Sequence, residues 1–571
     1  MTSRSFDPVR ASALLTVAMG AFSGLGLAAS AVAQAEQEPA AAEQAVPKSL
    51  PLAPDREKGS QAVAEADVRK WLGTLAGADF AGRGTGQEGY GKAAQYVADH
   101  FAALGLEARG KDGSYFQNVP WTRTSVRAAS MRLLTDTGEV AHEIPADRLS
   151  GRATDDAKAA GEAVLIIVTM PERTGRRMPK IEGLDEVDVE GKVAIVHVRG
   201  GGTGRSAAFA RFAVMRELQG KRAKAMVFAS AEPVEGGLSG SSGMARAGRN
   251  PAASAARRRP LDISIGGDDF GKLLGFAKLS ADKLDEAPLA TNLTYRAEIA
   301  IETASDEAPA MNVWAVLPGS DPKLRDEYVV IGSHLDHLGR RGDTIYPGAD
   351  DDGSGTTGVL AVAQMFAKNP VKPQRSVLFV CFSGEERGLV GSSYFVNNSP
   401  IPLSAIAAEL QMDMIGRNEE EGRDGGRLVN KGETGAQNRN SVHLVGTEKL
   451  SRTLHNLCME TNKTAKLDVE FDQESLFLRS DHANFARKGV PIAFFFTGLH
   501  QDYHQPSDTP DKINYPKLLR IARWVYDIGF SVANTSERPP VDADLWRTFK
   551  KGDRRGRMPD EPAAPMRETD K

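Results

Sequence analysis

The stretch from Tyr328 to Glu386 constrains this 571-residue chain more than any other part of it. Each of the two apolar runs in it is followed directly by side chains of types that commonly bind metals in proteins. Its parts in order are the run Tyr328–Ser333, His334-Leu335-Asp336-His337, the acidic loop Gly348–Gly355, a helical pattern, the run Ser376–Phe382 and Gly384-Glu385-Glu386. Imidazoles and carboxylates at the ends of buried strands are the groups that a divalent metal site needs.

From about residue 305 onward, strand and helix patterns alternate along the chain. Strands are predicted at 312–317, 328–332, 376–382, 406–412 and 491–496, and helices at 356–368, 389–397, 450–461, 481–488 and 516–534. Uniformly apolar strands alternating with helices predict an α/β fold, with a mostly parallel sheet covered by helices on both faces. Such sheets place their functional sites at the carboxyl ends of the strands.

A chain of this length exceeds one domain, and two or three are expected. We expect a first segment at 62–135, with helices near 64–75 and 94–104 around the glycine-rich loop Gly82–Gly86. That loop lacks the spacing of a phosphate-binding loop, so it is predicted to be a turn. Short apolar runs and one helix at 136–304 indicate an inserted β-rich domain, and 305–535 is expected to carry the site.

The two ends of the chain have different compositions from the rest. Residues 1–35 read as a secretory signal peptide, with an uncharged run after Arg10 and a small-residue cleavage pattern; an uncleaved membrane anchor is the alternative. Residues 36–61 are predicted to be a disordered linker and 536–571 a mobile charged tail. The protein is therefore expected to be exported to the periplasm or the extracellular space.

Charge and cysteine usage exclude some classes of function. A net charge of -4 gives no reason to expect nucleic acid or an anionic membrane as a partner. Cys381 and Cys458 are too few for a thiolate metal site, and Cys381 lies inside an apolar run, which is typical of a buried free thiol, although a bridge between the two stays open.

Five metal-compatible side chains follow apolar runs of the α/β segment: His334, Asp351, Glu386, Asp413 and His504. Two imidazoles and three carboxylates suit a pair of Zn²⁺ ions, and a carboxylate with both oxygens free can bridge them. Asp351, in the tight acidic loop, is the candidate bridge. A calcium-binding turn is the alternative for that loop, but calcium disfavours imidazole.

Glu385 is the candidate catalytic residue. Neighbouring glutamates at a strand end can face different ways, so we assign Glu386 to the metal and Glu385 to the proton of the attacking water. Asp336, two residues after His334, is expected to orient that imidazole from behind, unless it serves a turn. His337, His482 and His500 are less clearly part of the site, and Ser480-Asp481 is typical of a helix N-cap beside His482.

These residues resemble the motifs of the M28 family of zinc peptidases. The matching stretches are Gly332–His337, Gly348–Gly355, Ser383–Gly388, Met412-Asp413-Met414 and Tyr503–Thr509. The resemblance implies a phosphorylase/hydrolase-like core with two zinc ions. His334 and Asp413 would share one ion, Glu386 and His504 the other, with Asp351 between them, Glu385 as general base, and Asp336 and Asp508 behind the ligands.

The resemblance also implies a function. The chain is expected to be an aminopeptidase that acts on peptide or protein N-termini; a glutamate-releasing carboxypeptidase, a glutaminyl cyclase and a non-catalytic binding protein are the alternatives. The insert at 136–304 resembles a protease-associated (PA) domain, which would restrict access. Some members stabilise the oxyanion with a tyrosine shortly before Ser-Asp-His, where this chain has Phe477, so another donor or the metal is expected to do that work.

Overall fold

The computed structural model describes residues 55–169, 181–199, 205–219, 221–234, 237–244, 261–424 and 427–552. The predicted signal peptide, most of the predicted linker and the last part of the tail lie outside these residues.

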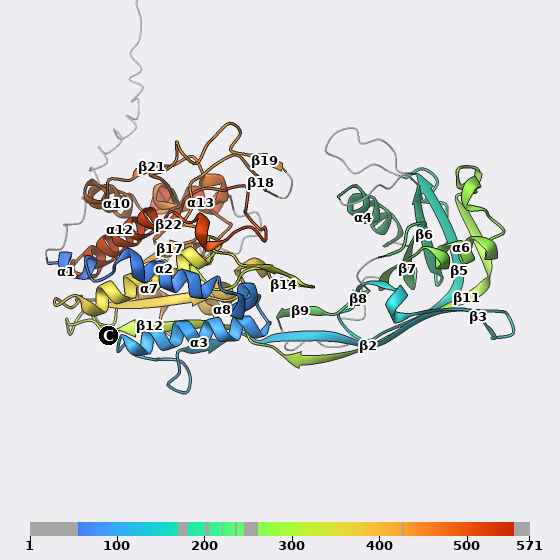
Figure 1. The fold of residues 1–571 in the computed structure, drawn as a ribbon, viewed down its shortest axis with the longest axis horizontal. Helices are drawn as coiled ribbons and strands as arrows, with labels where there is room; N and C mark the ends of the chain where they lie inside the picture. The colour runs from blue at the N-terminus through green and yellow to red at the C-terminus, as the bar shows by residue number, and fades with distance from the viewer. Residues whose placement is uncertain are drawn as a thin grey trace, which may run out of the picture. The chain divides into compact units, whose positions relative to one another are not determined.

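The first sheet has eight strands around a parallel centre (Figure 1). Its order is β1 (Phe116–Asn118), β12 (Met311–Leu317), β16 (Ser376–Phe382), β13 (Tyr328–His334), β17 (Ile406–Met412), β22 (Ile492–Phe496), β20 (Ser441–Val445) and β21 (Asp468–Glu470). The four strands from β16 to β22 run parallel, and antiparallel pairings flank them. The predicted mixed, largely parallel sheet is confirmed.

Helices cover both faces of this sheet, as predicted. One face carries α2 (Glu65–Leu75), α3 (Glu88–Ala103), α7 (Gly353–Lys368), α10 (Arg452–Ala465) and α12 (Tyr515–Ala533). The other carries α8 (Val390–Asn397), α9 (Thr447–Leu450), α11 (His482–Ala486) and α13 (Ala543–Lys551). Successive residues of β13 alternate between the two cores, Val329 to the first and Val330 to the second, which explains why the strand is apolar throughout.

Helix α7 begins three residues before its predicted start at Thr356. Asp352 caps it, because one carboxylate oxygen of Asp352 accepts a hydrogen bond from the Gly355 backbone N–H at 2.8 Å. The acidic loop therefore runs directly into a helix, and its backbone is fixed at that end.

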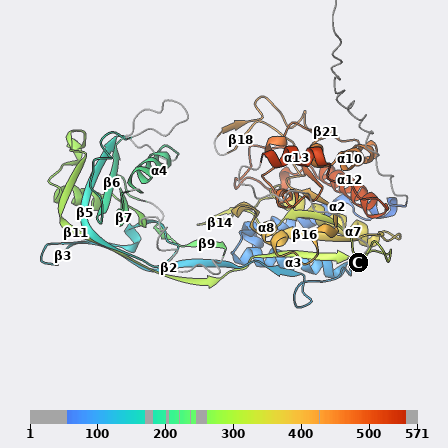
Figure 2. The same ribbon diagram turned by 180° about the vertical axis from the view of Figure 1, so that it is seen from behind.

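The second sheet lies in the predicted insert, whose described residues also include two α-helices. Its strands are β2 (Trp121–Leu134), β3 (Val140–Pro145), β4 (Ser150–Arg152), β5 (Ala157–Thr169), β6 (Val193–Arg199), β7 (Ala225–Ser230), β8 (Leu238–Ser239), β9 (Ser241–Met244), β10 (Leu261–Gly266) and β11 (Ala290–Glu307). Strands β5, β6, β7 and β10 are parallel neighbours, of which Figure 2 labels the first three, and the described helices are α4 (Arg205–Gln219) and α6 (Asp268–Phe276).

The insert begins earlier than the predicted boundary at residue 136. Strand β2 pairs with β11 from Thr122 to Leu134, so this segment belongs to the second sheet rather than to the first. The strand was missed because its polar residues alternate irregularly with small ones, which gives a weak period of two.

Parts of the two terminal segments that composition predicted to be disordered or mobile form helices. Residues 57–60 form α1 (Glu57–Ser60), where Gly59 is buried against α7 and α12; a Cβ there would lie 2.3 Å from the Tyr526 hydroxyl. Residues 543–551 form α13, and Trp546 is buried in the second core. In both cases a few buried residues that pack against the domain outweigh the polar composition around them. None of the described helices is long and apolar enough to cross a membrane.

Candidate metal centre

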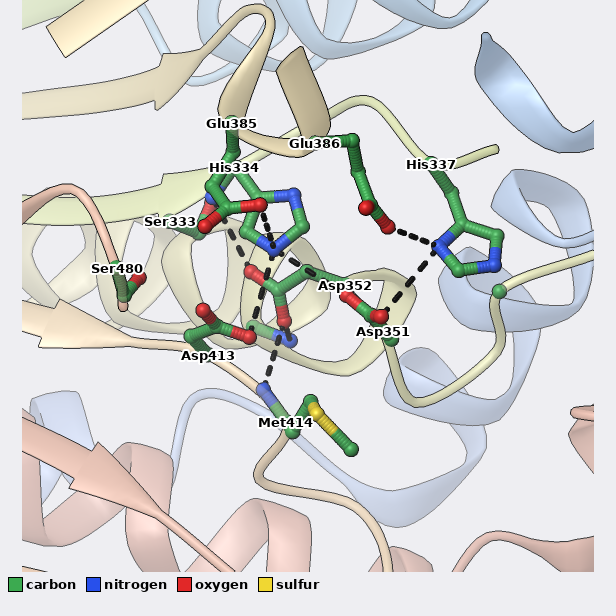
Figure 3. Close-up of polar contacts among 12 residues, drawn as sticks. Ser333, His334, His337, Asp351, Asp352, Glu385, Glu386, Asp413, Met414 and Ser480 are labelled. Atoms are coloured by element: carbon green, nitrogen blue, oxygen red, sulfur yellow. Dashed lines mark hydrogen bonds and ion pairs between the residues drawn. The ribbon is translucent and has the colours of Figure 1, made fainter. Parts of the chain in front are cut away.

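Three adjacent parallel strands bring the predicted site residues to one edge of the first sheet. His334 is the last residue of β13, Asp413 follows β17, and Glu385 and Glu386 lie in a 3₁₀ turn, η4 (Glu385–Arg387), after β16. The turn starts at Gly384 with φ of +68°, a conformation that glycine adopts without strain. Because of this turn, Glu385 points toward His334 and Glu386 toward His337 (Figure 3).

His334 faces carboxylates from three other segments. Its Nε2 lies 3.3 Å from Asp351 Oδ1, 3.4 Å from Asp413 Oδ1 and 4.0 Å from Glu385 Oε2 (Figure 3). Its other nitrogen, Nδ1, is 2.9 Å from the backbone carbonyl oxygen of Asp336, which fixes the ring orientation. The side chain is 1% exposed.

His504 faces the other oxygen of the same aspartate. Its Nε2 lies 3.1 Å from Asp351 Oδ2 and 3.2 Å from Glu386 Oε2. The two oxygens of Asp351 are therefore turned toward different imidazoles, Oδ1 to His334 and Oδ2 to His504. The five predicted ligands thus lie together, in the two groups that the resemblance implied.

His337 also lies at this site, although it was outside the predicted ligand set. Its Nδ1 is 2.9 Å from Glu386 Oε1 and 3.6 Å from Asp351 Oδ2 (Figure 3). Its ring forms a T-shaped contact with the ring of His504, with 5.8 Å between centroids.

Asp352 is close to the cluster but is occupied by the backbone. Its Oδ1 accepts hydrogen bonds from the N–H groups of Gly355 and Met414, and its Oδ2 accepts one from the His334 N–H at 3.1 Å. Both oxygens thus hold loops in place, which leaves Asp351 as the aspartate of this loop whose two oxygens face imidazoles.

Asp508 and Asp336 support the cluster through the backbone. Asp508 Oδ2 accepts hydrogen bonds from the N–H groups of Asp350 and Asp351 at 3.0 and 3.2 Å, which holds the acidic loop. The Asp336 carboxylate lies 3.9 Å from His334 Nδ1, so it does not hold the ring as predicted. It instead accepts hydrogen bonds from the Glu385 N–H at 3.0 Å and from the Thr85 hydroxyl at 2.8 Å.

The loop at 82–86, which the sequence marked only as a turn, holds the site from the side. The Arg83 guanidinium is fully buried and donates to the backbone carbonyls of Leu75, Leu335, Pro347 and Gly348, at 2.7 to 2.9 Å. It thereby ties helix α2 to the loop after β13 and to the acidic loop. A lone arginine between glycines gave no sequence signal for this role.

The charges of the cluster shift the pKa values of its members strongly. Burial by itself would raise the pKa of Asp351, but the imidazoles of His337, His334 and His504 outweigh it and hold that pKa well below its usual value. Burial, with Asp413 and Glu386 nearby, raises the pKa of Glu385 well above its usual value against the opposing effect of His334. The pKa values of the two glutamates in this turn thus shift in opposite directions, since the pKa of Glu386 is lowered to about 2 by His337 and His504 in spite of burial.

The donor set fits divalent zinc. Nitrogen and carboxylate ligands in this number are those of zinc sites. Several of their buried atoms have no hydrogen-bond partner among the described residues: both ring nitrogens of His337, Nε2 of His504 and Oε1 of Glu386. Buried polar atoms without a partner are costly, and a cation between them would satisfy nitrogens and oxygens together.

A pocket opens on this cluster and is apolar on its far side. It is lined by His334, Asp351, Glu385, Asp413, Met414, Leu476, Arg479, Phe494, Phe496, Leu499 and Tyr503. Arg479 donates to Asp424 Oδ2 at 2.8 Å and to the Tyr503 hydroxyl at 3.1 Å. Tyr503 stacks on His504 with ring centroids 3.9 Å apart, so its phenol lies beside the cluster and is a donor that the sequence analysis had not assigned.

The remaining histidines have other surroundings. His482 is buried and stacks on Phe494, with 4.4 Å between ring centroids. Asp481 stands at the N-cap position of α11 without capping it; its side chain instead accepts from the Ser392 hydroxyl. His500 Nε2 lies 3.2 Å from Asp350 Oδ2, behind the acidic loop. Both cysteines are buried and free, so no bridge forms between them.

Residues 312–528 match the family model "Peptidase family M28". A probable leucine aminopeptidase of Arthroderma otae is 28% identical over 231 residues, which are 39% of this chain and 57% of the relative. Leupeptin-inactivating enzyme 1 of Streptomyces exfoliatus is 29% identical over 218 residues, 38% of this chain and 41% of the relative. The chain thus spans about half the length of the curated relatives it matches. Among solved structures, an aminopeptidase from Aneurinibacillus sp. strain AM-1 aligns with a TM-score of 0.48 and 18% identity, over 85% of this chain and 98% of that one.

Proposed function

Since the chain belongs to peptidase family M28 through residues 312–528, we propose that it is a zinc-dependent aminopeptidase that releases N-terminal residues from peptides. One observation carries the proposal: the two oxygens of Asp351 face two different imidazoles, with Asp413 beside one and Glu386 beside the other. A bridging carboxylate between two metals needs this arrangement.

The site residues have distinct roles in this proposal. His334, Asp351 and Asp413 would hold one zinc ion, and Asp351, Glu386 and His504 the other. Two such ions would supply the Lewis acid that activates water and the scissile carbonyl. Asp336 and Asp508 position the loops that carry these ligands.

Glu385 acts as the general base. It takes a proton from the attacking water as the water oxygen bonds to the carbonyl carbon, and it returns that proton to the nitrogen as the C–N bond breaks. Its backbone N–H is held by Asp336, and its side chain lines the pocket beside His334 and Asp413. A carboxyl with a raised pKa suits both halves of this transfer.

Tyr503 donates to the oxygen on which negative charge develops. Its phenol lines the pocket, and Arg479 holds it at 3.1 Å. This residue replaces the tyrosine that some family members carry before Ser-Asp-His, where Phe477 stands here. A fixed donor aimed at developing charge is one of the larger single contributions to catalysis.

The pocket favours an aminopeptidase over a carboxypeptidase. Arg479 is the cationic side chain among the described residues that line it, and Asp424 is already paired with that guanidinium. A substrate's free carboxylate would therefore meet a neutralised partner. An N-terminal ammonium would meet Glu385 and Asp413, and Met414, Phe494 and Leu499 would accept an apolar side chain.

Two further parts of the proposal concern the whole chain. We propose that residues 1–35 direct export, so that the enzyme acts in the periplasm or outside the cell, and that the second sheet is a PA-like module which limits substrate access. Support for export comes from the composition of residues 1–35, and support for the module comes from its own sheet and cores.

The experiment is a comparison of substrates and metals. Purified protein should hydrolyse leucine anilide faster than N-blocked dipeptides, lose that activity to a zinc chelator and regain it with Zn²⁺. Glu385→Gln should lower kcat by about 10²–10⁴-fold, the usual contribution of a general base, and leave zinc content unchanged. Activity in a chelator-treated sample freed of zinc, or an undiminished Glu385→Gln variant, would contradict the proposal.

A further inference from the structure

His337 makes a set of contacts that the five-ligand site does not explain. The residue is buried, with a side chain that is 0% exposed. Its Nδ1 lies 2.9 Å from Glu386 Oε1 and 3.6 Å from Asp351 Oδ2. His504 approaches the other oxygen of Glu386 and the same oxygen of Asp351. Two imidazoles and two carboxylates therefore surround one point on this side of Asp351.

The contact between His337 and Glu386 lacks the geometry of a hydrogen bond. Neither ring nitrogen of His337 has a hydrogen-bond partner among the described residues, and the same holds for Nε2 of His504 and Oε1 of Glu386. The nitrogens and oxygens are thus close to each other without pointing along each other's N–H or lone-pair directions. One cation could serve as a partner for all of these atoms, because His337, Asp351 and Glu386 offer ligand atoms that all lie within 4.8 Å of one another.

The fold makes room for this imidazole and keeps it in place. Gly348 of the acidic loop has φ of +57°, and a Cβ there would lie 2.4 Å from Cγ of His337. The backbone N–H of His337 donates to the Arg83 carbonyl at 3.3 Å, and Gly84 pairs with His337 as an isolated β-bridge. The ring is therefore fixed by the loop at 82–86 on one side and packed against Gly348 on the other.

We propose that His337 Nδ1 is a fourth protein ligand of the zinc ion held by Asp351, Glu386 and His504. Two nitrogens and two oxygens complete a tetrahedral shell, which is typical of zinc that the protein encloses fully. The ion held by His334, Asp351 and Asp413 would have three protein ligands, which leaves a position for solvent on that side, next to Glu385.

This inference rests on the proposed zinc site, so its test measures metal binding apart from activity. The variants are His337→Gln and His337→Asn, and the matched control is His100→Gln, because His100 is a half-buried histidine on α3 that packs against Trp71 and whose Nε2 is buried. Zinc affinity is measured by competition with a graded chelator. We expect one of the two zinc sites to weaken by about tenfold or more in both His337 variants and neither site to weaken in the control.

A second measurement needs no variant. X-ray absorption of the fully loaded wild-type protein should report three imidazoles shared by two zinc ions, and the His337 variants should report two. Thermal unfolding of the metal-free proteins checks that the variants fold, and the rise in Tm on adding zinc should be smaller in the His337 variants than in the control.

The outcomes separate the two proposals. If the wild-type protein binds no zinc tightly, the result contradicts both the proposed function and this inference. This inference alone is contradicted if the wild-type protein binds two zinc ions through only two imidazoles. It is also contradicted if the His337 variants keep the zinc affinities of both sites within about twofold of the wild type. His337 would then be a packing residue beside Glu386.

Discussion

Three consecutive aspartates show how the environment divides identical side chains. Asp350 Oδ1 accepts from the Gly416 N–H and its Oδ2 faces His500; both oxygens of Asp352 accept backbone N–H groups. Asp351 alone among the three turns both oxygens to imidazoles of the site. Each acid has a different set of polar partners, which is what permits three carboxylates in a row in a buried loop.

Tyr503→Phe tests the proposed oxyanion donor. Loss of one fixed donor should lower kcat for leucine anilide by about 10²–10³-fold with little change in KM or zinc content, because the donor matters most when charge develops. Tyr115→Phe is the matched control, since that phenol donates to the Leu106 carbonyl away from the pocket. A kcat within twofold of the wild type would show that Tyr503 only packs on His504.

His443 gives a prediction for stability against pH. Burial by itself would lower its pKa, but the hydrogen bond that the imidazole donates to Glu419, with Asp472 and Glu470 nearby, outweighs this and raises the pKa. The imidazole lies 3.0 Å from Glu419 and 3.0 Å from Asp472. A raised folded-state pKa means that the stabilisation is fully present below the unfolded value of about 6.5 and is lost as pH rises through the folded value.

His443→Gln should therefore lower Tm more at pH 6 than at pH 9. Thermal unfolding of the two proteins across that range measures the difference, with the metal content held constant. Equal losses of Tm at both ends of the range would show that His443 is not charged in the folded protein.

At the scale of elements, the site depends on where three parallel strands end. The carboxyl ends of β16, β13 and β17 lie side by side, so residues separated by tens of positions in sequence become neighbours. Short tight segments then aim the side chains: the turn Glu385–Arg387 splits the two glutamates, and the cap of α7 fixes the acidic loop. His504 itself stands at φ of +58°, an unfavourable conformation that its neighbours maintain.

Arg83→Met tests the link between helix α2 and these loops. The change leaves up to four buried carbonyls without their donor and removes a cation that faces Asp352 and Asp508. We expect a loss of about 3–5 kcal/mol in the free energy of unfolding, as for other buried charges removed from their partners. Chemical denaturation measures it.

Lys92→Met is the control for Arg83→Met. Lys92 is half exposed and pairs with Glu88 one turn away on α3, so its loss should change the free energy of unfolding by less than about 0.5 kcal/mol. Similar losses in the two variants would mean that Arg83 does not hold the loops.

At the scale of the whole molecule, the chain enters and leaves the second sheet at one place. Thr122 of β2 and Glu307 of β11 are paired residues, so the segment between them starts and ends on neighbouring strands. Trp121, just before the entry, packs with Val119 and Ala310 in a small core of its own. The described residues of the second sheet bring two further cores, separate from those of the first.

Excision of residues 123–306 is the test of this organisation. Joining Thr122 to Glu307 through Asn-Gly, which forms tight hairpin turns, should give a folded protein that cleaves leucine anilide within a few-fold of the full chain. Activity on longer peptides should rise if the second sheet limits access. A shortened protein that folds and binds zinc but no longer cleaves leucine anilide would assign the second sheet a direct part in the site.

Five strands of the first sheet, β12, β13, β16, β17 and β22, and most of its helices follow from the sequence within a few residues, because their apolar runs are long and uninterrupted. The short strands β1, β20 and β21 of that sheet were not predicted. Strand β2 could not be predicted, because its alternation of polar and apolar residues is weak. Helices α1 and α13 could not be predicted either, because the packing of single residues such as Gly59 and Trp546 outweighs a polar composition. The five candidate ligands and Glu385 were proposed from residue type and from their place after apolar runs, and the structure brings these side chains close together. His337, Tyr503 and Arg83 were not assigned, since their roles depend on neighbours that lie far away in sequence.

Which residue types follow the buried strands can be read from the sequence, because side-chain chemistry and hydrophobic periodicity are local properties. The folded structure is needed to show that Asp351 faces two imidazoles, that Asp352 accepts hydrogen bonds from the backbone and that His337 lies against Glu386. Those outcomes depend on distances of about 3 Å between segments separated by up to some 170 positions, and packing alone sets such distances.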